Sequence, residues 1–155
     1  MADAAPFPEP HAERRRWMAV LARASGEEIA ARLGDQATLS DYTRLRGPEA
    51  GLVMVRGRIG GGGGAFNLGE MTVTRCTVRI ESGLVGHAYV AGRDGRQAEL
   101  AALVDAMLQD PETAPALQAD IIEPLAAAQQ QRRDGVAAKA AATQVQFFAM
   151  QNMRT

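Results

Sequence analysis

Apolar positions near the start of the chain recur at helical spacing and predict two short helices. The first helix would turn one apolar stripe inward: Trp17, Val20, Leu21 and Ala24. Ser25 and Glu28 are spaced as a capping box, in which each side chain bonds the backbone amide of the other residue, so a second helix is expected to begin there. This second helix would bury Ile29 and Leu33 and stop at Gly34.

After residue 34 the pattern changes to the alternation that is typical of strands. Residues 52–59 alternate, residues 66–80 form one long strand-like run, and residues 84–91 form a third. Ser82 and Gly83 supply a tight turn between the last two strands. Three consecutive strands with short links predict an antiparallel meander.

The long middle strand changes its apolar phase partway along. Residues 71 and 73 share one phase, whereas residues 78 and 80 share the opposite one. A strand cannot exchange its buried face without an irregularity, so we expect a bulge or bend near Arg75 or Cys76.

The second half of the chain returns to helical spacing. Asp94 is a suitable N-cap for a helix with one apolar stripe. This stripe comprises Leu100, Leu103, Val104, Met107 and Leu108. A further helix is expected up to Glu123, where Pro124 would interrupt it, and another over residues 125–142. Residues 143–147 alternate polar and apolar side chains and predict a terminal strand.

This order of elements predicts an α+β fold. We expect an antiparallel sheet, made of the three-strand meander plus extra strands, packed against N-terminal and C-terminal helices. Three prolines at the start (Pro6, Pro8 and Pro10) predict a flexible arm over residues 1–12, followed by a single domain over residues 13–155.

Composition and charge narrow the class of protein. One cysteine excludes a disulfide framework, and one cysteine with two distant histidines argues against a metal site. The formal net charge of -1 gives no field that would attract nucleic acid. No apolar run approaches a membrane span and no secretory signal is legible, so we expect a cytoplasmic protein.

The glycine run at residues 60–64 is the first candidate for chemistry. Free glycine amides can converge on a phosphate, but this run is followed by a strand and lacks the residues of a P-loop. A plain hairpin connection is the favoured interpretation. Arg56 and Arg58 lead into the run and keep an anion-binding role open.

Arginines on the predicted strands are the second candidate. Arg75 and Arg79 could share a sheet face with Arg56 and Arg58, either around an anion or as a solvated face paired with Glu70 and Glu81. Arg93 and Asp94 lie at a strand-to-helix turn, where free amides can face a ligand. The candidate contacts with ligand or partner are therefore Arg56, Arg58, Gly60, Gly61, Arg75, Arg79, Arg93 and Asp94.

We identify no catalytic set in the sequence. His87 and Cys76 fit packing roles within strands, and Asp94 fits a helix cap better than a catalytic base. The apolar end of the chain instead indicates assembly with another protein, through Phe147, Phe148 and Met150.

Five blocks of the sequence, in order, resemble the PhnG family: residues 16–22 with 28–33, 51–61, 74–79, 92–106 and 145–150. The resemblance implies an accessory subunit of the bacterial carbon–phosphorus lyase system, which breaks down organic phosphonates. It implies PhnH, PhnI and PhnJ as partners, with PhnL associated. Such a complex transfers the ribose 5-triphosphate part of ATP to methylphosphonate and releases adenine. ATP would then be a substrate of the complex, and this chain would carry neither a cofactor nor an assigned catalytic residue.

An alternative from a different class stays open at this stage. The chain could be an autonomous module that binds an anion or nucleotide through its arginines and glycine run, without catalysis.

Overall fold

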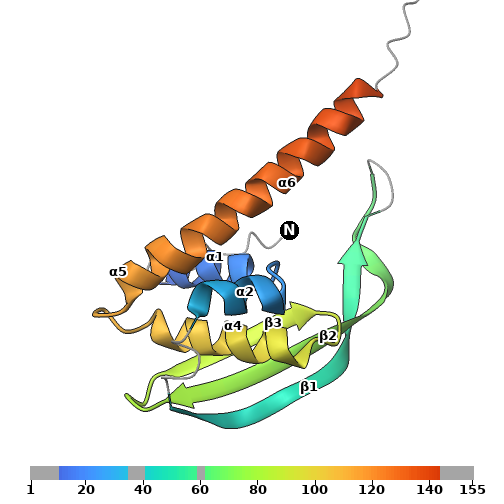
Figure 1. Cartoon of the computed structure of the whole chain (residues 1–155). Coiled ribbons are helices and arrows are strands. Elements are labelled where there is room, and N and C mark those ends of the chain that lie inside the picture. The colour runs from blue at the N-terminus through green and yellow to red at the C-terminus, as the bar shows by residue number, and fades with distance from the viewer. Residues whose placement is uncertain (1–10, 35–40, 59–61, 144–155) are drawn as a thin grey trace, which may run out of the picture.

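A computed structural model describes residues 11–34, 41–58 and 62–143 of the chain (Figure 1). The elements in order are α1 (Ala12–Leu21), α2 (Gly26–Leu33), β1 (Tyr42–Gly57), β2 (Phe66–Ile80), β3 (Val85–Ala91), α4 (Gly95–Met107), α5 (Ala114–Leu117), the π-helix η2 (Gln118–Ile122) and α6 (Glu123–Ala142). The strands form one antiparallel sheet in the order β1-β2-β3. The α+β class and the three-strand meander are thus confirmed.

Helix α4 is the centre of the fold. It lies across one face of the sheet, against β2 and β3, while α1 and α2 pack on its other side (Figure 1). Small side chains on α4 allow a close approach to the sheet: Ala98, Ala101, Ala102 and Ala106 are all buried. Strand β3 has Gly86 at the point of contact. A Cβ at this position would lie 1.9 Å from the backbone oxygen of Ala102.

The predicted start and stop of α2 are confirmed. The Ser25 hydroxyl oxygen accepts a hydrogen bond from the Glu28 amide at 3.1 Å, and the Glu28 carboxylate accepts one from the Ser25 amide at 2.8 Å. Gly34 ends the helix with a φ of 53°, a backbone conformation that favours glycine.

An irregularity lies at the level of Cys76, as expected, but the extra residue is on β1 and not on β2. Strand β2 pairs with β3 without a break from Val73 to Arg79. Opposite Cys76, β1 places residues 47–48 between its register positions Arg46 and Glu49, and the register of β1 shifts again at residues 44–46 and 55–56. Pro48 explains this position, because proline has no amide hydrogen to continue the ladder and is tolerated on an edge strand.

Met71 supplied the misleading phase. Its side chain is 39% exposed because it shares with Val73 the face of β2 that is turned away from α4. The buried positions that face the helix keep a single phase through Thr74, Cys76 and Val78. No change of face was therefore needed.

The interruption expected at Pro124 is also wrong. Helix α6 follows η2 directly, and Pro124 lies in the first turn of α6. The Glu123 amide donates to the Gln118 carbonyl five residues back, which is the wider spacing of a π turn. This wide turn lies where the proline ring would otherwise collide with the preceding helical carbonyl, so the helical path continues.

Helix α6 leaves the body of the molecule in its second half. Leu125 and Gln129 are buried, and every residue from 130 to 143 is exposed. The last contact that ties α6 to the rest of the described chain is the ion pair of Arg132 with Glu28, at 2.8 Å. Beyond it the helix projects away from the sheet (Figure 1).

Two further sequence predictions concern the ends of the chain. Thr143 follows α6 and is not in a strand, and residues 144–147 of the predicted terminal strand lie outside the described residues. The same holds for residues 1–10 of the predicted arm. Within the described ranges, the sheet has the three strands of the meander and no extra strand.

Candidate functional site

A buried carboxylate joins three elements at the centre of the molecule. Asp105 on α4 is fully buried. It accepts hydrogen bonds from both Nε and Nη2 of Arg14, at 3.1 and 2.8 Å, and from the indole of Trp17, at 2.8 Å. The backbone amide of His87 donates to it at 2.9 Å. With four protein donors and no exposed surface, this carboxylate holds α1 and β3 against α4 rather than offering a base to a substrate.

Sequence reasoning did not single out Asp105. The available indication was an acidic residue between Val104 and Ala106, within the apolar stripe of a helix. A carboxylate at such a position requires partners, because an unpaired buried charge is costly.

Arg75 lies on the outer face of the sheet and already has an ion-pair partner. Its Nε donates to the Glu49 carboxylate at 2.5 Å, and Arg46 donates to the same oxygen at 2.7 Å. The partner of Arg75 is therefore Glu49 on the neighbouring strand, directly opposite in the register, and not the Glu70 or Glu81 that the sequence suggested. This geometry fits the solvated-face interpretation of Arg75.

Arg56 is far from Arg75. It pairs with Asn67 in the register and donates to the Ala65 carbonyl at 3.3 Å, beside the hairpin connection. Eight residues of β2 separate the two register positions, roughly 26 Å at the rise of a strand. Arg58 follows the end of β1 and is exposed. The four arginines thus do not form one cluster, and Gly60 and Gly61 lie outside the described residues.

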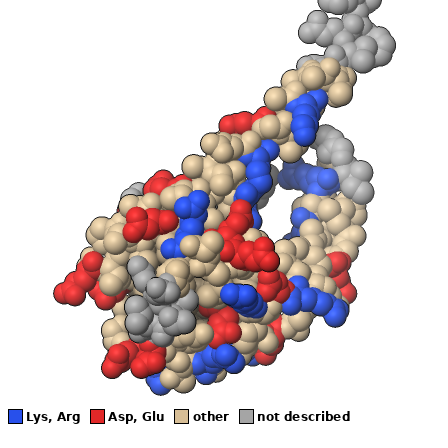
Figure 2. Space-filling view, viewed as in Figure 1, with Lys and Arg blue, Asp and Glu red and all other residues tan. Residues whose placement is uncertain are grey.

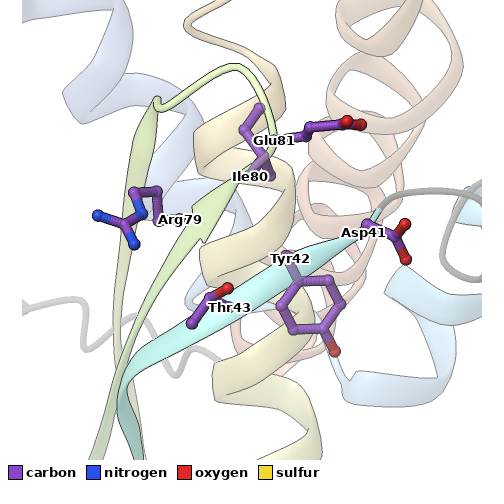
Figure 3. Close-up of a pocket in the computed structure, with 6 residues that line it drawn as sticks. All are labelled: Asp41, Tyr42, Thr43, Arg79, Ile80 and Glu81. Carbon is purple, nitrogen blue, oxygen red and sulfur yellow. The ribbon is translucent and has the colours of Figure 1, made fainter.

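Arg79 borders an open hollow of about 490 Å³ at the other end of the sheet (Figure 3). The hollow is lined by Asp41, Tyr42, Thr43, Arg79, Ile80 and Glu81. In Figure 3 the guanidinium of Arg79 points away from the side chains of Tyr42 and Asp41. One cation and two carboxylates do not converge on a common point, so this hollow has no geometry for gripping a phosphate.

The side chain of Tyr42, which lines this hollow, is bonded to helix α4. Its hydroxyl donates to the Glu99 carboxylate at 2.7 Å, and Arg44 donates to the same oxygen at 2.6 Å. Burial, followed by the bond to Glu99, raises the pKa of Tyr42 above its ordinary value. This network fixes the start of β1 on α4.

Asp94 caps α4, as the favoured interpretation predicts. Its carboxylate accepts from the Gln97 amide at 2.9 Å. The side chain of Gln97 then donates to the carbonyl of Ala24 at 2.6 Å, which ties this helix start to the turn between α1 and α2. Asp94 therefore serves the fold in the described structure, whereas Arg93 beside it is exposed.

Cys76 is packed as a small apolar residue, as its strand position predicts. Its side chain is 1% exposed, and its thiol donates to the Arg46 carbonyl at 3.4 Å. Burial raises the pKa of this thiol above its ordinary value. Among the described residues, no three His, Cys, Asp or Glu side chains gather into a group that could hold a metal ion.

Part of the sheet exposes large apolar side chains that no described element covers. Strand β3 accompanies β2 only from residue 73 onward, so residues 52–57 of β1 and 66–72 of β2 form a two-stranded ribbon, here called the hairpin arm. Its large apolar side chains are 39–63% exposed: Leu52, Met54, Phe66, Leu68 and Met71. Leu52 and Met54 continue the face that α4 covers further along the sheet, but no described element covers them.

The hairpin arm and the outer half of α6 rise on the same side of the body (Figure 1). Figure 2 shows an open space between them that is bordered by side chains of both charges. An apolar ribbon with polar side chains around it is the kind of surface that receives another protein.

These observations describe a small α+β protein in which polar side chains secure the fold and an apolar arm stays exposed. Residues 12–153 match the family described as "Phosphonate metabolism protein PhnG". The chain is also 44% identical over 139 residues to the "Alpha-D-ribose 1-methylphosphonate 5-triphosphate synthase subunit PhnG" of Rhizobium meliloti (strain 1021), covering 90% of this chain and 88% of that relative. The chain therefore belongs to the PhnG family.

No helix in the described part of the chain combines the length and the apolar character that crossing a membrane requires.

Proposed function

We propose that the chain is an accessory subunit of an α-D-ribose 1-methylphosphonate 5-triphosphate synthase. The printed name of the relative from Rhizobium meliloti supports this assignment, since the similarity spans nearly the whole of both chains. The complex would transfer the ribose 5-triphosphate part of ATP to methylphosphonate and release adenine, in the cytoplasm where ATP is available. PhnH, PhnI and PhnJ would be the sister subunits, with PhnL associated.

The hairpin arm is the observation that supports a docking role. A two-stranded ribbon by itself is marginally stable in water, and this one exposes apolar side chains beyond the cover of α4. Contact with a sister subunit would bury Leu52 and Met54 and stabilise the ribbon.

The contacts made by the candidate polar residues favour support over independent turnover. Asp105 is saturated with protein donors, Asp94 caps a helix and Arg75 is paired with Glu49. Each of these groups has a structural use in the described chain. The proposed role is therefore to complete and stabilise an active site that its partners supply.

The variant Met54→Glu tests the docking role. Met54 is 52% exposed but lies opposite Glu70, so we expect the free energy of unfolding of the isolated variant to fall by no more than about 1 kcal/mol. A carboxylate in the apolar contact would be buried without a partner, so the variant should fail to co-purify with its sister subunits. The readouts are co-purification after co-expression, and adenine release from ATP and methylphosphonate by the complex.

Leu45→Glu is the matched control. Leu45 lies on the same strand, is 48% exposed and is not part of the hairpin arm. We expect this variant to assemble and to support adenine release as the wild type does. A Met54→Glu chain that assembles with wild-type yield would contradict the claim that the hairpin arm contacts a sister subunit.

Titration calorimetry with ATP separates the proposal from the anion-binding alternative. The isolated chain should give no binding heat, because its arginines are divided between distant sites. Tight binding of ATP by the chain alone would favour the autonomous module instead.

A further inference from the structure

The outer edge of β3 is closed at one end and free at the other. Near its start, the Val85 carbonyl accepts from Arg14 at 3.3 Å and from Gln109 at 2.8 Å. The next outward group, the His87 amide, donates to Asp105. The side chains of Arg14, Gln109 and Asp105 thus satisfy the outward backbone groups that a fourth strand would otherwise bond.

Further along, the edge has no such cover among the described residues. Because the His87 amide points away from β2, the antiparallel ladder turns the amide and carbonyl of Tyr89 and the amide of Ala91 outward as well. No described side chain or backbone group is bonded to them. An unpaired edge of this kind is a template for an added strand.

An apolar groove runs beside this free edge. It lies between α1 and β3 and is lined by Met18, Leu21, Ala22, His87, Ala88, Tyr89, Val90 and Ala101. An added strand would direct every second side chain into this groove and the others toward the outer face of the sheet, beside the half-exposed Tyr89. A strand that is apolar at alternate positions would therefore fit this edge and its groove.

The same chain contains a segment with that pattern. Residues 144–150 read Gln-Val-Gln-Phe-Phe-Ala-Met, and they follow the exposed half of α6. Val145, Phe147 and Ala149 share one phase and would lie over the groove, while Phe148 would lie beside Tyr89.

The reach of the chain excludes an insertion of Val145–Phe147 into the groove of the same molecule. The side chain of Gln129 donates to the carbonyl of Val20, beside the groove, at 2.8 Å. From Gln129 to Thr143 the helix advances roughly 21 Å away from this point. The four residues from Thr143 to Phe147 span at most about 14 Å, so Val145–Phe147 cannot return to this point.

We propose that the free edge of β3 binds, as a short fourth strand, residues 144–150 of a second copy of this chain. One chain carries both the edge with its groove and the segment that would pair with it, so two copies can exchange these segments around a twofold axis and leave neither edge unpaired. The proposal does not depend on the reaction in which the protein takes part.

Removing residues 144–155 tests the exchange. We expect the full chain to be a dimer by light scattering at micromolar concentration and the truncated chain to be a monomer with an unchanged unfolding temperature. A full chain that is monomeric, or a truncated chain that is still dimeric, overturns the proposal. Transfer of the segment to a sister subunit would appear as the first of these outcomes.

Amide hydrogen exchange on the same two proteins locates the contact. In the full chain the amides of Tyr89 and Ala91 should exchange slowly, and in the truncated chain at least tenfold faster. The His87 amide is the internal control, because its bond to Asp105 is present in both proteins. Equal exchange of Tyr89 and Ala91 in the two proteins would contradict the added strand even if the oligomeric state changed.

Ala91→Pro is a second variant that leaves the tail intact. Proline removes only an outward amide hydrogen at this edge position, so β3 keeps its bonds to β2. We expect a monomer that retains the wild-type circular dichroism spectrum. An Ala91→Pro dimer of wild-type affinity would count against pairing at this edge.

Discussion

Gly86 shows how a single position fixes the distance between a strand and a helix. A Cβ there would lie 1.9 Å from the Ala102 oxygen and 2.5 Å from the Ala106 nitrogen, and both atoms belong to the backbone of α4. Neither can move without displacing the central helix. The glycine is therefore required by lack of space.

Gly86→Ala should lower the free energy of unfolding by at least about 3 kcal/mol, measured by urea denaturation with Trp17 fluorescence as the signal. Gly69→Ala is the matched control on a neighbouring strand, since a Cβ at Gly69 meets nothing within 4 Å. The control should be neutral or slightly stabilising, because alanine loses less entropy on folding. Equal stability of the two variants would refute the steric argument.

At the scale of elements, the capping box makes α2 sensitive to acid. The Ser25 amide is the main cause that lowers the pKa of Glu28, followed by the bond from Arg132. A carboxyl whose pKa is lower in the folded state stabilises the fold above its unfolded pKa. This stabilisation is lost as the pH falls through the folded pKa.

Glu28→Gln should therefore reduce stability at neutral pH and flatten the loss of stability below pH of about 4.5, the usual range of a glutamate. Thermal unfolding across this range measures the effect. Glu27→Gln provides the comparison, because it removes a carboxylate from the same turn but neither bond of the box. A Glu28→Gln curve parallel to that of the wild type would exclude the carboxylate as the cause.

Local chemistry explains which elements the sequence could predict. The capping box, the end of α2 at Gly34 and the N-cap Asp94 depend on neighbouring residues, and all three are confirmed. The bulge and the effect of Pro124 depend on partners that the local pattern does not contain. The bulge lies in β1 beside Pro48, and the π turn before Pro124 keeps the helix continuous.

At the scale of the whole molecule, Asp105 joins three elements that are distant in sequence. Asp105→Asn keeps the shape of the side chain, but it leaves Arg14 without its charged partner and one donor without an acceptor. We expect the free energy of unfolding to fall by about 3 kcal/mol, because breaking a buried ion pair leaves the remaining charge without a partner. Urea denaturation measures the loss.

Asp120→Asn, at an exposed position in η2, is the control and should stay within about 0.5 kcal/mol of the wild type. An Asp105→Asn chain as stable as this control would show that the buried carboxylate does not hold the three elements together.

The candidate site was less accessible to sequence reasoning than the fold. The alternation of residues 52–59 predicts a strand, but only the register shows that β3 stops short and leaves Leu52 and Met54 uncovered. The arginine cluster was suggested by spacing along separate strands, and the register separates Arg56 from Arg75. Long-range pairing decides both matters, and one sequence does not contain it.

The position of Cys76 has a practical consequence. The sole thiol of the chain is enclosed between the sheet and α4, where burial keeps it protonated. A thiol reagent can reach it only when that layer separates, so the rate of labelling counts the openings of the core. The native sequence thus contains an internal probe, because the rate at which Cys76 is labelled reports how often the core opens.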